Sequence, residues 1–542
     1  MTIHISARVA WHDHGWDGCV CRNPKANTYC VGQFTFPGEL IAERRNLELE
    51  ETLKGKPAGE EPGFFIPCLA SVNAFGPAPI PAQMPPPKWF TDKTSPRTWI
   101  IPPYTICSWP YEEVYKEEVL NTETKYPKYD PVKRRAAVNE YFSKIKPASS
   151  LIFYYANYSN PFSENDQQRY VVVGMSRIKA IGEEITWTDQ SEEMERRYGP
   201  NVWMRNITSN YPDEGLRIPY EAYKDQPEIL ERILFIPENP RAFKYATRQI
   251  SDDGALSLVE RMAEIVGVLI EIGDNHENWP LRLAWLNSLM AELWQNRGLY
   301  PGLLRVLDYL KFSEGIAYAT TQFTLKGEQK VKELLFSFLR EEITEIPDLS
   351  ISAERISSVR KKWRLLEPNQ QTLLSETLPR FDLRTDQIAQ IIDHPEDVSI
   401  LSAPQEIAHN PYILCEQYVG LDVDDQVTFN QIDHGMLPSP DLGKATLVEP
   451  DGWQRLRALC VEQMQRQDQH TFLLADTVLA GVNHKLSFLP DWKKADFNIR
   501  YLEIDKDEIG KAVKFRYESE KLYLYLKWIF EDEREVENIL RQ

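Results

Sequence analysis

The chain has 542 residues, 42% of them hydrophobic and 26% charged, an ordinary globular composition. This length predicts about three to five domains rather than one core. The formal net charge of −19 argues against a surface coated with cations for nucleic acid, although a local basic face remains compatible with it. No stretch approaches the roughly 20 apolar residues that cross a bilayer, and the N-terminus lacks a secretory signal, so we predict a cytoplasmic protein.

Residues 1–95 are rich in Pro, Gly and aromatic residues, and we expect a small Cys-rich module there with one short helix near 39–53. A segment that cannot build a large core would gain stability from a bound metal. The local cluster of cysteines predicts a tetrahedral zinc site, with an iron–sulfur cluster as the alternative, although the spacing C-x-C-x8-C-x37-C differs from that of a standard zinc finger. The candidate ligands are Cys21, Cys30 and Cys68, completed by Cys19 or His12. The other interpretation is that these cysteines are small buried hydrophobic residues.

Residues 97–235 are predicted to form a β domain, because β-branched and aromatic runs at 151–156 and 169–178 flank a polar turn. The stretch 151–182 resembles PUA-like folds, EVE and YTH domains among them. That resemblance implies an open β-barrel that holds a modified base in a cage. Aromatic rings on such a sheet would stack a base, and the candidates are Tyr154, Tyr155, Trp187 and Trp203. The alternative is that these rings form a packed face of the sheet.

Residues 238–400 show apolar positions at three- and four-residue spacing, which predicts a helical domain. The expected helices cover 255–270, 281–296, 330–339 and 352–366. Two basic clusters are candidates for contact with DNA phosphates, although a solvated helix face explains either one as well. These candidates are Arg360, Lys361, Lys362 and Arg364 in the helical domain, and Lys133, Arg134 and Arg135 in the β domain.

Residues 401–480 carry the most specific pattern. The stretch 407–429 is similar to the L-x-x-N-P-Y-x-L…G…D segment that precedes the motor in RecD-like helicases, relatives of the exodeoxyribonuclease V alpha subunit. The stretches 9–30, 292–303, 433–459 and 469–474 also resemble that family. The resemblance implies a helix-hairpin-helix-like domain over 401–480 and DNA as a partner. The chain departs from the family at Gln469, where the family has Gly, and it lacks the hairpin G-x-G after Val419.

Residues 481–542 are predicted to form a short α/β connector, with a strand near 498–504 and a final helix from Lys514 to Leu540. In the family that the chain resembles, the corresponding helix leads into the first motor domain. The resemblance therefore implies a helicase motor as a partner subunit or as a C-terminal part of a longer protein.

No G-x-x-x-x-G-K-[ST] phosphate loop, G-x-S-x-G elbow or H-E-x-x-H pattern occurs, so we predict no ATP site and no catalytic residue in this chain. The expected fold class is α+β with several domains. The expected function is a DNA-binding accessory part of a RecD-like helicase system, which delivers DNA to a motor that this chain does not contain, in DNA repair or anti-phage defence. The alternatives are a stand-alone module that binds a modified nucleobase and, third, a metal-dependent nuclease.

Overall fold

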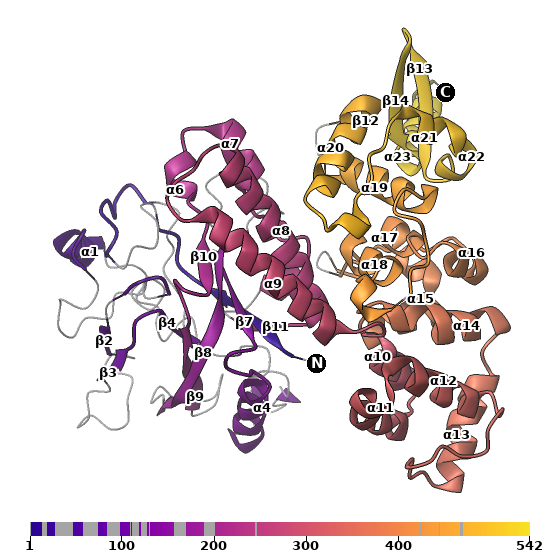
Figure 1. The fold of residues 1–542 in the computed structure, drawn as a ribbon, viewed down its shortest axis with the longest axis horizontal. Coiled ribbons are helices and arrows are strands. Elements are labelled where there is room, and N and C mark those ends of the chain that lie inside the picture. Colours follow the sequence, from indigo (N-terminus) through magenta and orange to yellow (C-terminus); the bar gives the residue numbers. More distant parts are fainter. Residues whose placement is uncertain are drawn as a thin grey trace. The chain divides into compact units, whose positions relative to one another are not determined.

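The chain divides into two compact units, Met1–Leu289 and Met290–Gln542, drawn in Figure 1. The structure, a computed structural model, describes residues 2–12, 19–27, 47–57, 74–77, 79–83, 98–108, 110, 119–120, 127–128, 131–156, 170–188, 201–243, 247–422, 425–443, 445–466 and 470–541. Both helices and sheets are well represented, so the expected mixture of α and β structure is confirmed. Among the described helices, none has the length and apolar content needed to cross a membrane.

A mixed sheet is the main β element of the first unit (Figure 1). Its described strands follow the order β11–β1–β7–β8–β9–β4, and β10 also pairs with β8. Strand β1 runs parallel to β7, whereas the other neighbours are antiparallel. The strands are β1 (His4–Arg8), β4 (Thr105–Ser108), β7 (Leu151–Ala156), β8 (Val171–Thr188), β9 (Asn201–Ser209), β10 (Gly215–Arg217) and β11 (Thr247–Ile250). Two short strand pairs lie outside this sheet: β2 (Ile80–Gln83) pairs with β3 (Thr98–Ile101), and β5 (Val119–Leu120) pairs with β6 (Pro127–Lys128).

The first strand of the chain lies inside this sheet, which corrects the expected domain boundaries. Ile5 of β1 pairs with Ile152 of β7 on one side and with Gln249 of β11 on the other. Strand β11 in turn lies beyond the expected end of the β domain at residue 235. No local sequence pattern indicates that two strands so distant in sequence will pair. The composition of residues 1–95 therefore led to the prediction of a separate N-terminal module.

Helix α8 (Asp252–Glu271) is tied to the first strand through its N-terminus. The hydroxyl of Ser251 accepts a hydrogen bond from the backbone of Gly254, an ordinary N-cap. Asp252 accepts hydrogen bonds from the backbone of Thr2 (3.0 Å) and from the His4 ring (3.2 Å). Its carboxylate therefore joins the beginning of the chain to the helix that covers residues 252–271. The other helices of this unit are α1 (Leu47–Leu53), α4 (Pro131–Ser143), α6 (Tyr220–Tyr223) and α7 (Pro227–Ile233), and α9 (Trp279–Arg297) runs across the division between the units.

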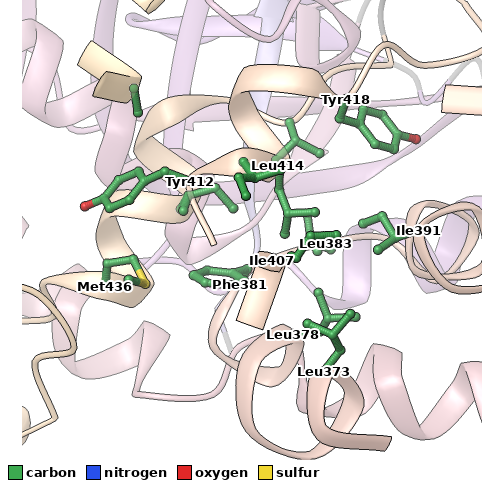
Figure 2. Close-up of a cluster of buried hydrophobic side chains, with 14 of the residues drawn as sticks. Leu373, Leu378, Phe381, Leu383, Ile391, Ile407, Tyr412, Leu414, Tyr418 and Met436 are labelled. Atoms are coloured by element: carbon green, nitrogen blue, oxygen red, sulfur yellow. The ribbon is translucent and has the colours of Figure 1, made fainter. Parts of the chain in front are cut away.

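The second unit is built mainly from helices around one hydrophobic core. Figure 2 shows part of that core, where Phe381, Tyr412, Leu414 and Met436 converge. Its described α-helices of five or more residues are α10 (Leu303–Tyr309), α11 (Ser313–Lys326), α12 (Glu328–Leu339), α13 (Ala353–Arg364), α14 (Pro368–Thr372), α15 (Thr385–Asp393), α16 (Pro404–His409), α17 (Ile413–Gln417), α18 (Phe429–Met436), α19 (Trp453–Gln465), α20 (Ala475–Ser487), α21 (Ile499–Ile504) and α23 (Lys527–Arg541). The expected helices at 255–270, 281–296, 330–339 and 352–366 correspond to α8, α9, α12 and α13 and are confirmed.

The last sixty residues differ from the expectation in two places. The predicted strand near 498–504 is helix α21, which the Asn498 side chain caps by accepting from the backbone of Arg500. The first half of the predicted final helix is a hairpin of β13 (Val513–Glu518) and β14 (Lys521–Leu526), and the helix begins only at Lys527. Apolar and polar residues alternate along both strands, and a period of two favours a strand over a helix. With β12 (Phe472–Leu474) the hairpin makes a sheet in the order β12–β14–β13.

Candidate nucleic-acid interface

A buried carboxylate organises the region 405–480 of the second unit. Asp433 of α18 accepts from Arg455 Nε at 2.8 Å, from Lys493 Nζ at 3.1 Å and from the Tyr412 hydroxyl at 2.7 Å. All four side chains are essentially inaccessible to solvent. Burial alone would raise the pKa of Asp433, but the charges of Arg455 and Lys493 outweigh it and hold the pKa well below its usual range. This buried, ionised network therefore holds together α18, α19 and the short segment 491–493.

Helices α9 and α18 meet beside this network. The ring of Trp294 lies 5.2 Å from the ring of His434 and 5.3 Å from the Nζ of Lys493. Arg297 covers the same ring at 5.5 Å and donates to the backbone carbonyls of Gly298 and Arg380. The stretches 292–303 and 433–459 therefore contribute to one packed centre, and a structural role accounts for Arg297.

The glycines of the 292–303 stretch lie close to atoms of neighbouring segments. Gly298 has a positive φ of 68°, and a β-carbon there would lie 2.1 Å from a carboxylate oxygen of Glu328. That carboxylate accepts from the backbone amides of Leu299 and Tyr300. The amide of Gly302 donates to the carbonyl of Pro379, and a β-carbon there would lie 2.1 Å from the carbonyl oxygen of Phe381. The two glycines permit the end of α9 to pack against neighbouring segments of the second unit.

The loop after Val419 closes on itself. Val419 pairs with Gln426 in an isolated bridge, and the amide of Gly420 donates to the carbonyl of Asp425. The side chain of Asp425 accepts from Arg384, Gln387 and Tyr418 at 2.7–2.9 Å. The Gly420 amide and the Asp425 carboxylate are thus both used within the protein, and they anchor this turn.

The basic cluster on α13 has an internal half and an exposed half. Arg360 donates to the carbonyls of Phe338 and Ile343 at 3.0 and 2.8 Å and lies over the Phe338 ring. Lys362 donates to the carbonyl of Tyr309 and lies over that ring at 4.3 Å, and burial lowers its pKa. The prediction that all four cations of this cluster bind DNA is therefore corrected. Lys361 and Arg364 are exposed and remain candidates.

The second basic cluster, on α4, keeps two exposed members, Lys133 and Arg135. Arg134 is 2% exposed, so it is corrected from a DNA ligand to a buried residue. Arg135 forms an ion pair with Glu184 of β8 at 2.9 Å. Lys133 is exposed to solvent. This helix consequently offers a weaker positive surface than its sequence suggests.

The tyrosines proposed for base stacking are buried, which corrects that prediction. Tyr154 and Tyr155 have no exposed area, because every residue of β7 is covered on both faces of the sheet. Their rings pack edge-on against Phe75 and Phe243 at 4.9 and 5.3 Å. The other two candidates, Trp187 and Trp203, belong to β8 and β9, but their side chains lie outside the described residues. The packed-face interpretation therefore applies to the tyrosines.

The cysteine cluster is described only in part, because Cys30 and Cys68 lie outside the described residues. Cys21 is buried and Cys19 is half-buried. The Asn27 amide contacts both the Cys21 sulfur, at 3.7 Å, and the carbonyl of Trp11, the residue before His12. Cys21 and His12 are both buried, and a thiol and an imidazole are groups that suit zinc. Within the described ranges, no three His, Cys, Asp or Glu residues gather as a metal site.

The small sheet carries a surface that sequence patterns did not single out. Phe472 of β12 stacks on Tyr525 with ring centroids 4.9 Å apart and meets Tyr523 edge-on at 5.6 Å. Lys514 and Arg516 of β13 pair with Tyr525 and Tyr523 across the sheet, so their side chains share this face. The alternation of aromatic and basic residues in 514–525 was a detectable signal, but the assignment of that segment to a helix concealed it.

Comparisons with known proteins find similarity to an archaeal protein whose name states no activity. The chain is 23% identical over 498 residues to the protein named Uncharacterized protein MJ1519 of Methanocaldococcus jannaschii. The match covers 85% of this chain and 37% of the relative, so the chain spans little more than a third of the relative's length. No family model and no solved structure matches the chain.

Proposed function

We propose that this chain is the DNA-binding accessory part of a RecD-like helicase system, and that it presents DNA to a motor outside residues 1–542. The observation that carries the proposal is the buried centre around Asp433. Three stretches that resemble the helicase family contribute residues to this centre, namely 292–303, 407–429 and 433–459. A shared packing core is what a common fold would require, so the meeting of these stretches supports the resemblance.

Two further features support a partner and a ligand. Lys361 and Arg364 are exposed side by side at the end of α13, where cations can contact phosphates without disturbing the core. The longer relative has room for a further domain beside the matched region. We propose that the motor is either a second subunit or another part of a longer protein. The bound zinc ion proposed near Cys21 would act as a structural staple, since thiolates and imidazole suit a closed tetrahedral site.

DNA binding by the complete chain tests this proposal. We expect the Lys361→Gln, Arg364→Gln double variant to weaken binding and to reduce the slope of log affinity against log salt by about 0.9 per lost phosphate contact with duplex DNA. Fluorescence anisotropy of labelled DNA over a salt series measures both quantities. Lys494→Gln removes an exposed lysine elsewhere in the same unit and should leave both unchanged.

Two results would count against the proposal. Absence of binding to single-stranded and duplex DNA at low salt would remove DNA as the ligand. Equal affinity and salt slope in the double variant would remove α13 from the interface.

A further inference from the structure

We propose that the outer face of the sheet β12–β14–β13 is a stacking site for single-stranded nucleic acid. This inference rests on the proposed function and deepens it, because it assigns a second site and a strand preference. Its defining residues, called the hairpin face below, are Phe472, Lys514, Arg516, Lys521, Tyr523 and Tyr525. Figure 1 shows the hairpin of β13 and β14 at one end of the second unit, next to α23.

The strand register places these side chains on one surface. Phe472 and Lys514 both pair with Tyr525 from opposite sides, and residues directly across a sheet point to the same face. Two positions along, Arg516 pairs with Tyr523. The guanidinium of Arg516 also donates to the Tyr525 hydroxyl at 3.2 Å. The hairpin face therefore interleaves rings with cations, the composition that grips a single strand.

The composition of this face is unexpected for its position. The opposite face supplies Leu522, Leu524 and Leu526 to the core, and all three are buried. An antiparallel sheet with one face on the core normally presents polar residues on the other. Here Phe472 stands 46% exposed, so a large apolar ring remains in water. A ligand that covers the ring would remove that exposed apolar area.

Helix α23 covers part of the hairpin face, at Tyr525, but leaves Phe472 accessible to solvent. Phe530 of α23 meets Tyr525 edge-on at 5.5 Å, and Tyr525 is only 4% exposed. Tyr525 thus supports Phe472 from below, whereas Phe472 and the half-buried Tyr523 are the rings that a base can reach. Nucleobases in a duplex are already stacked and paired, so only unpaired bases can lie on these rings.

The cations around the rings are exposed and weakly engaged. Arg516 is 53% exposed, and its contact with Glu518 at 3.5 Å is a solvent-exposed pair. Such pairs contribute little to stability, so a phosphate can replace the carboxylate at small cost. Lys514 and Lys521 are also exposed on the two strands of the hairpin. Phosphates on either side of a stacked base would therefore meet positive charge.

Binding of labelled single strands to the complete chain tests the inference, with oligo(dT) and oligo(U) of about 20 nucleotides and a duplex of equal length as probes. We expect Phe472→Ala to weaken binding of single strands about 5- to 100-fold, the range for loss of one stacked base, and to leave duplex binding unchanged. Phe472→Trp should restore binding because it keeps a flat π face. Tighter oligo(U) than oligo(dT) would identify RNA as the ligand, and the reverse would identify DNA.

Matched variants separate stacking from folding. Tyr517→Ala removes a ring of comparable exposure from the opposite face of the same sheet and should bind as the unsubstituted chain does. Phe472→Leu keeps apolar contact with Tyr525 but loses the π face, so it should fold normally and bind weakly. Lys514→Gln should lower the salt slope for single strands by about 0.7.

The outcomes distinguish the inference from the proposed function. If the unsubstituted chain binds single strands and both Phe472→Leu and Lys514→Gln bind them equally well, the hairpin face is not the site, while DNA binding stands. If the unsubstituted chain binds neither single strands nor duplex, the proposed function fails and the inference fails with it.

Discussion

At the scale of single residues, the carboxylate of Asp433 connects the stretches 407–429 and 433–459, because it accepts hydrogen bonds from Tyr412 and from Arg455. The charge lies among two cations and a hydroxyl without access to water. A buried charge is tolerated only when it is paired and hydrogen-bonded. Tyr412 and Arg455, which come from different stretches, therefore depend on one acidic side chain.

We predict that Asp433→Asn destabilises the protein by about 3–5 kcal/mol, because Arg455 and Lys493 would remain buried without a counter-charge. Urea unfolding followed by circular dichroism measures the change. Asp441→Asn alters an exposed carboxylate in the same region and serves as the control. Equal unfolding midpoints for the two variants would contradict a central role for the network.

The same residue predicts a pH dependence. The folded pKa of Asp433 lies below the ordinary value of 3.8, so its ionised form favours the folded state above that pH. This contribution is lost as the pH falls below 3.8, where the unfolded chain takes up the proton first. The difference in unfolding midpoint between the unsubstituted protein and Asp433→Asn should therefore shrink between neutral pH and pH values below 3.8.

The cysteines near the N-terminus carry a prediction of their own. We expect the Cys21→Ser, Cys30→Ser double variant to lose bound zinc, since thiolates are the ligands that such a site would need. Elemental analysis of the purified chain by mass spectrometry measures metal content directly. Cys415→Ser, in the second unit, should retain the metal. Equal metal content in all three proteins would exclude a zinc site at these cysteines.

At the scale of elements, the junction between α9 and α10 depends on glycine. Gly298 combines a left-handed backbone with close approach of Glu328, whereas Gly273, just after α8, has a similar φ of 73° but open space around it. The two positions therefore separate backbone strain from steric exclusion.

We predict that Gly273→Ala costs about 1–2 kcal/mol, the usual penalty for a side chain in the left-handed region. Gly298→Ala should cost more, because Glu328 must also move and release the amides of Leu299 and Tyr300. Thermal unfolding of both variants compares the two costs. Equal destabilisation would indicate that Glu328 moves aside freely.

Element positions could be predicted where apolar spacing was regular and long. Helices α8, α9, α12 and α13 follow the predicted ranges within a few residues because their buried faces repeat every three to four positions. The prediction of one helix over 514–540 was wrong, because residues 514–526 alternate with the period of two that is typical of strands. Only the residues from Lys527 onward form the predicted helix. The aromatic and basic residues of the hairpin face were therefore not recognised as one surface.

At the scale of the whole molecule, charge and sheet topology limit what local patterns can predict. The net charge of −19 is compatible with the proposal only if cations are concentrated, as on α13 and on the hairpin face. The main sheet joins residues 4–8 to residues 151–156 and 247–250. Such pairing depends on the complete fold of the first unit rather than on any one segment.

The amino-acid sequence alone determined the class of structure, most of the long helices and the stretches that meet at Asp433, because these follow from residue spacing and local chemistry. Only the tertiary structure decided which side chains of a cluster reach solvent. Arg360 and Lys362 face inward while Lys361 and Arg364 face outward, although the four lie within five positions of one helix. The physical reason is that burial depends on the neighbours brought by distant segments, here the carbonyls of Phe338 and Tyr309.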